Sequence, residues 1–109
     1  MALQGQSFKK KDWALFRDKI AGWQENYMDR LNKEYIELLS SDAAPSEKFW
    51  ALDKRIKEDK GKKGVRIQMS RSDLIYNIIS LINEGAISMD DLEEFSDELK
   101  ETVRFLVER

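Results

Sequence analysis

The side chains in this sequence that could do chemistry fall into an acidic group and a basic group. The acidic group consists of Asp90, Asp91, Glu93 and Glu94. Neighbouring carboxylates can hold a cation, but this spacing lacks the alternating acidic residues and central glycine of a calcium loop. The same residues suit the positive N-terminal end of a helix. We therefore expect no metal site.

The basic group lies in the middle of the chain. Residues 54–71 hold 8 Lys or Arg against 2 Asp or Glu, whereas residues 72–109 hold 3 against 10 and residues 1–53 hold 8 against 9. The net charge of -2 therefore hides a strong asymmetry. A basic centre can attract the acidic C-terminal third or contact phosphates. The candidate nucleic-acid-binding residues are Lys60, Lys62, Lys63, Arg66 and Gln68.

The residue types that most enzymes use are missing. The 109 residues include no histidine and no cysteine. Their absence removes the usual zinc ligands, the commonest general base and the Ser-His and Cys-His nucleophile pairs. No constellation of the remaining tyrosines, lysines and carboxylates stands out as an acid–base site. We expect no enzymatic activity, no catalytic residue and no cofactor.

The elements that must position these groups are helices. Apolar residues recur at intervals of three and four from Trp13 to Leu38, as one face of a long helix requires. A narrower stripe of Phe49, Leu52 and Ile56 follows Pro45. The predicted helices span about residues 9–40, 45–59, 71–84 and 88–108. They predict an all-α, four-helix bundle-like domain in which the third helix is the most buried.

The chain divides at a run of glycines and lysines, residues 60–64. After it, apolar and polar residues alternate over residues 65–69, which indicates at most a short strand. The predicted organisation is a flexible leader (1–8) and a single helical domain (9–109), made of a hairpin (9–59), a basic hinge (60–64) and a second hairpin (65–109).

Two aromatic residues fall off the predicted apolar stripes. Trp50 flanks the stripe of the second helix, and Phe105 lies well off the apolar face of the fourth. Both are candidate partner-binding residues, because exposed aromatic side chains often anchor protein interfaces. Alternatively, Trp50 covers an edge of the core and Phe105 lies in a frayed C-terminus.

The hydropathy of the chain argues against a membrane protein. The longest apolar run, residues 74–82, is far shorter than the roughly 20 residues that span a bilayer. Residues 1–7 lack the apolar region of a signal peptide. We expect a soluble, cytoplasmic protein with no membrane partner.

Residues 65–109 resemble a ribbon-helix-helix module in the order of their elements, with Gly85 between two predicted helices. The resemblance implies a dimer whose paired strands place Arg66 and Gln68 in the major groove of DNA. In that family the second helix approaches the phosphate backbone with its N-terminus. Here Asp90 and Asp91 would repel phosphate at that position.

Three stretches cover most of the chain: DWALFRDKIAGWQENYMDRLNKEYIELL, PSEKFWALDKRIKEDK and MSRSDLIYNIISLINEGAISMDDLEEFSDELKETVRFL. They resemble a family of small helical proteins of uncharacterised function from bacterial accessory and mobile-element genomes. Members are sometimes labelled automatically as multidrug transporters, a label that the hydropathy of this chain contradicts. The family implies no catalytic residues, and its setting suggests a regulatory or anti-defence role.

Taken together, the sequence favours a non-enzymatic helical protein that binds another macromolecule. A protein partner is favoured, and a second copy of the chain is one candidate for it. The alternative is a DNA-binding regulator of the ribbon-helix-helix type that uses residues 65–70.

Overall fold

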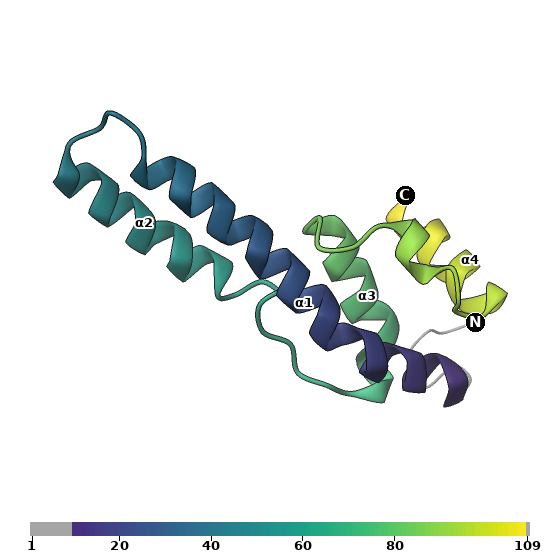
Figure 1. Ribbon diagram of the computed structural model, residues 1–109. Coiled ribbons are helices and arrows are strands. Elements are labelled where there is room, and N and C mark those ends of the chain that lie inside the picture. The colour runs from purple at the N-terminus through teal and green to yellow at the C-terminus, as the bar shows by residue number, and fades with distance from the viewer. Residues whose placement is uncertain (1–9, 109) are drawn as a thin grey trace.

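The structure, a computed structural model, describes residues 10–108 as an all-α domain (Figure 1). The expected leader, residues 1–8, lies outside the described residues. The helices are α1 (Lys10–Leu39), α2 (Pro45–Asp59), α3 (Leu74–Asn83) and α4 (Asp97–Val107), with short 3-10 turns at Arg71–Asp73 and Met89–Leu92. The first three agree with the predicted spans to within a few residues.

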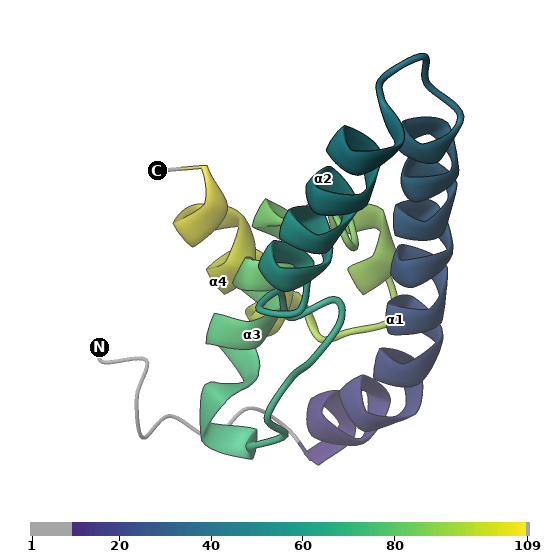
Figure 2. The same ribbon diagram turned by 90° about the vertical axis from the view of Figure 1, so that its left-hand side faces the viewer.

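Helix α1 is the axis of an elongated molecule that measures 53 × 23 × 23 Å. α2 runs antiparallel to the second half of α1, and α3 and α4 lie beside its first half (Figures 1 and 2). Pro45 opens α2 at its first turn, where the absence of an N–H has no consequence. The loop at residues 40–44, which joins α1 to α2, lies at one end of the molecule (Figure 1).

The buried core belongs to the first half of α1 and the C-terminal half of the chain. α2 contributes no buried apolar residue, so the predicted bundle of four helices around one shared core is not confirmed. The predicted stripe of α1 and the strong burial of α3 are confirmed. The buried apolar residues are Phe16, Ile20, Tyr27, Leu31, Leu74, Ile75, Ile78, Leu81, Ala86, Ile87, Leu92, Phe95, Leu99 and Val103.

The turn after α3 fixes this half of the molecule to α1. Gly85 has a φ of 79°, the left-handed conformation that glycine adopts without strain. The Arg30 guanidinium from α1 donates from Nη2 to the carbonyls of Gly85 and Ala86, at 2.7 and 3.2 Å. The two carbonyls that follow α3 thus gain a charged donor.

The predicted fourth helix, residues 88–108, is wrong in its first half. A 3-10 turn with Ser88 at its N-terminus comes first, and α4 begins only after Ser96. The buried carboxylate of Asp12 accepts hydrogen bonds from the backbone N–H and the hydroxyl of Ser96, at 2.8 and 2.6 Å. Ser96 Oγ in turn accepts from the N–H of Leu99. This contact fixes the start of α4 at Ser96, although the apolar spacing of the sequence continues through that position without a break.

The short strand expected at residues 65–69 is wrong for the single chain, since residues 10–108 contain no strand. Burial does alternate along this segment: Val65 and Ile67 pack against the core, whereas Arg66 and Gln68 are exposed. The period of two therefore reflects an extended segment that lies on a helical core.

Candidate binding surfaces

The loop end of the α1–α2 hairpin carries an exposed apolar surface. Four large apolar side chains lie within two turns of the loop, and we call them the apolar tip: Ile36, Leu39, Phe49 and Trp50. Ile36, Phe49 and Trp50 are 62%, 62% and 63% exposed. The rings of Phe49 and Trp50 meet edge to face, with centroids 5.0 Å apart. No side chain in residues 32–58 is buried.

The two aromatics predicted to bind a partner are both exposed, but the structure does not bring them together. Phe105 is 67% exposed on α4, which lies at the other end of the molecule from the hairpin loop (Figure 1). Trp50 instead joins Phe49. Phe49 belongs to the apolar stripe predicted for the second helix but is exposed, whereas Leu52 and Ile56 of the same stripe are half-buried.

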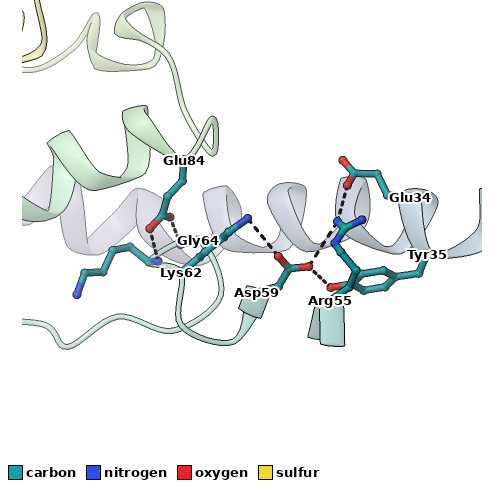
Figure 3. Close-up of polar contacts among 8 residues, drawn as sticks. Glu34, Tyr35, Arg55, Asp59, Lys62, Gly64 and Glu84 are labelled. Carbon is teal, nitrogen blue, oxygen red and sulfur yellow. Dashed lines mark hydrogen bonds and ion pairs between the residues drawn. The ribbon is translucent and has the colours of Figure 1, made fainter. Parts of the chain in front are cut away.

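Polar side chains hold the base of the hairpin (Figure 3). Asp59, the buried residue of α2, accepts a 2.5 Å hydrogen bond from the Tyr35 hydroxyl. The carboxylate also lies 3.1 Å from Lys62 Nζ and 3.6 Å from Arg55 Nη2. Arg55 extends the network to Glu34 at 2.6 Å and stacks over the Tyr35 ring. We call Glu34, Tyr35, Arg55, Asp59 and Lys62 the polar junction.

The polar junction shifts two pKa values in opposite directions. Burial, followed by the hydrogen bond to Asp59, raises the pKa of Tyr35 to about 12. Burial alone would raise the pKa of Asp59, but hydrogen bonds from Tyr35 and Lys62 outweigh it and lower that pKa. At neutral pH the phenol is therefore a stable donor and the carboxylate a stable acceptor.

Hydrogen bonds hold the segment predicted as a basic hinge to α1 and to the C-terminal end of α3. Glu84, just after α3, accepts from the N–H groups of Lys63 and Gly64 at 2.9 and 3.0 Å (Figure 3). Gln24 of α1 donates to the carbonyl of Lys63 at 3.0 Å. Gly64 is buried against Tyr27, where a Cβ atom would lie only 2.3 Å from a ring carbon. Close backbone approach therefore requires glycine at position 64.

Four of the five predicted nucleic-acid-binding residues line one open groove of about 620 Å³, between the end of α2 and the segment that follows. Lys57 joins them, with Gly61 and Ile67 between. We define the basic groove by its polar residues: Lys57, Lys60, Lys63, Arg66 and Gln68. The fifth predicted residue, Lys62, is outside the groove lining and pairs with Asp59.

Two of the acidic residues near the start of the fourth predicted helix make contacts within the fold. Asp91 accepts from the N–H of Ser88 at 2.8 Å, as the predicted capping arrangement requires. Glu94 pairs with Lys19 of α1 at 2.6 Å. Within residues 10–108, no three His, Cys, Asp or Glu side chains are grouped so that they could hold a metal ion.

Sequence reasoning missed Ile36, Leu39 and Phe49 as surface residues and Lys57 as part of the groove. Phe49 continues the apolar stripe of α2, so no local signal separates it from a core residue. Ile36 and Leu39 fall off the stripe of α1, which runs through Tyr35 and Leu38, and could have been found from that spacing. Lys57 could have been found, since it stands one helical turn before Lys60, the residue at the C-terminal cap of α2.

Within the described part of the chain, no helix combines the length and apolar character that a membrane span requires. In comparisons with known proteins, no family model, no curated protein and no solved structure matches this chain.

Proposed function

We propose that this protein has no enzymatic activity and acts by binding another protein through the apolar tip. The observation that carries the proposal is the exposure of Phe49 and Trp50 on a hairpin end that buries no side chain between residues 32 and 58. Large apolar side chains clustered on a projecting element are typical of protein interaction sites.

The apolar tip holds enough surface to anchor an interface. An aromatic side chain buries roughly 150–250 Å², so the exposed two-thirds of Phe49 and Trp50 leave roughly 100–150 Å² each to be covered. At about 25 cal/mol per Å², covering each ring contributes ~3 kcal/mol before the costs of association. Tryptophan is also among the residues most enriched at binding hot spots.

The chemistry of the polar junction supports a structural role for its ionisable groups. A general acid or base works best with a pKa near the working pH. The pKa of Tyr35 is raised to about 12, and that of Asp59 is lowered below its ordinary value. Both shifts lead away from neutrality and therefore favour stable hydrogen bonding over proton transfer.

The ribbon-helix-helix alternative gains no support from the fold, because residues 65–69 form no strand in the single chain. The resemblance to mobile-element proteins supplies the setting of our proposal, which is a bacterial cytoplasm. A regulatory or anti-defence role is the further alternative within that setting.

The occupant that we infer is a protein with an apolar helical face, and a second copy of this chain is the first example to test. Both helices of the hairpin expose apolar residues at the tip, on α1 and on α2. Two such hairpins can cover each other as the pairs of helices in a four-helix bundle do.

The test is photo-crosslinking from position 50. A benzophenone amino acid replaces Trp50 in one variant and, as a matched control, Tyr76 in another; Tyr76 is 66% exposed on α3. We expect a protein adduct only from position 50, and twice the monomer mass identifies a second copy. Adding Ile36→Ser and Phe49→Ser should remove the adduct. Absence of an adduct, or equal adducts from both positions, contradicts the proposal.

A further inference from the structure

The geometry points to a second binding surface: the basic groove contacts the phosphate backbone of double-stranded nucleic acid, independently of base sequence. This inference does not depend on the proposed protein partner, because the groove and the apolar tip share no residue. The resemblance to ribbon-helix-helix modules implied that Arg66 and Gln68 reach the major groove of DNA from a strand. In the structure the two residues line the basic groove of the protein, and residues 10–108 contain no strand.

Three of the four cations in the basic groove have no ion-pair partner among residues 10–108. Its lining includes Lys57, Lys60, Lys63 and Arg66 and no carboxylate. Lys57 pairs with Asp53 at 3.0 Å. For the other three side chains, no carboxylate among residues 10–108 lies within ion-pair distance. Three cations that have no internal counter-ion around one concave surface attract an external anion.

Asp59 and Glu84, which lie close to the groove in the sequence or the fold, bind other groups. Asp59 is occupied by Tyr35 and Lys62, and the carboxylate of Glu84 accepts two backbone N–H groups. Lysines at the end of a helix are favoured by its dipole, which accounts for Lys57 and Lys60. Helix stability does not account for Lys63 and Arg66, because both follow the end of α2.

The backbone that carries the groove is held in place. The carbonyl of Lys63 accepts from Gln24, and the carbonyl of Gln68 accepts from the buried Asn77 at 3.4 Å. Between them, Ile67 packs toward the core while Arg66 remains exposed. A fixed backbone reduces the ordering cost of binding, so the cations are presented before any ligand arrives.

The shape and lining of the groove select the class of ligand. It is broad and open, at about 620 Å³, so it suits a ridge of a polymer better than an enclosed small molecule. No aromatic side chain lines it, so it lacks the stacking platform that single-stranded nucleic acids use. Several lysine and arginine cations on one open surface suit the densely charged phosphate backbone of a duplex.

The experiment is a salt titration with a fluorescent 20-base-pair duplex of random sequence, followed by anisotropy from 50 to 200 mM NaCl. Four phosphate contacts predict a slope of log K against log salt of about -3.6. The double variant Lys63→Gln, Arg66→Gln should bind at least tenfold more weakly at 50 mM salt and lose about 2 from the slope.

The matched control is Lys48→Gln, Arg104→Gln, which removes the same charge from sites outside the groove. It should keep the dissociation constant within twofold, and circular dichroism should show that both variants remain helical. Absence of duplex binding at 50 mM salt overturns the inference, and so does an equal loss in both variants. Equal competition by poly-glutamate of the same total charge overturns the assignment to nucleic acid.

Discussion

The two ends of α1 carry apolar residues in different surroundings. Near its start, Phe16 and Ile20 are buried under α3 and α4, whereas near its end Ile36 and Leu39 are exposed beside α2 alone. Beyond the apolar core, polar contacts join the two helices of the hairpin: Asp59 of α2 binds Tyr35 of α1 and lies beside Arg55. Apolar burial stabilises one end, whereas the other leaves its apolar residues exposed to solvent.

The sharpest test of this comparison is the same substitution in the core and at the loop end of the hairpin. Phe16→Ala removes a ring that is 0% exposed, so we expect a loss of about 3–5 kcal/mol in the free energy of unfolding. Phe49→Ala removes an exposed ring and should change stability by no more than about 0.5 kcal/mol in the monomer. Urea unfolding at low protein concentration measures both. Similar losses at the two positions would show that the hairpin end is as well packed as the core.

A second test concerns the connection between the two ends. Gly64→Ala places a methyl group against the buried ring of Tyr27, so we expect a destabilisation of about 1–3 kcal/mol. Gly22→Ala is the control, because a Cβ atom there meets no atom within 4 Å; it should stabilise α1 by up to about 1 kcal/mol. Thermal melts should shift in opposite directions. A shift of the same sign would contradict the close approach at Gly64.

The smallest expected effect tests the polar junction. Tyr35→Phe removes one hydrogen bond to Asp59 and should cost about 0.5–1.5 kcal/mol at pH 7. In the folded chain the pKa of Tyr35 is raised from 10.0 to about 12, so the folded state keeps the phenolic proton longer than the unfolded state. The stabilisation is therefore complete below pH 10 and declines as the pH rises toward 12.

Urea unfolding of the wild type and Tyr35→Phe at several pH values between 8 and 12 measures this decline. The difference in stability between the two proteins should shrink as the pH rises from about 10 to about 12. A difference that stays constant across this range would mean that the hydroxyl does not act through its proton. Absorbance of the phenolate gives the pKa directly as a control.

The sequence predicted features that depend on local periodicity. The stripe of α1, the burial of α3 and the exposure of Phe105 follow from residues a few positions apart. Phe49 was misplaced because a stripe shows which side of α2 faces a neighbour, but not how much of that side a neighbour covers. Lys62 was assigned to the ligand surface because its partner, Asp59, could not be recognised as buried.

The break between the 3-10 turn and α4 was beyond sequence reasoning for a different reason. Its cause is Asp12, whose carboxylate binds Ser96 from 84 positions away. The residues around Ser96 continue the apolar period of the preceding turn, so local pattern alone favours one uninterrupted helix. Only a tertiary contact distinguishes the two arrangements.

The bond between Asp12 and Ser96 also sets an order of events in folding. The α1–α2 hairpin closes a short loop, whereas this bond must close a loop of 84 positions before it contributes anything. Translation at about 5–20 residues per second separates the emergence of the two residues by roughly 4–17 s. The hairpin can therefore assemble on the ribosome, while the carboxylate of Asp12 remains in solvent until α4 has been made.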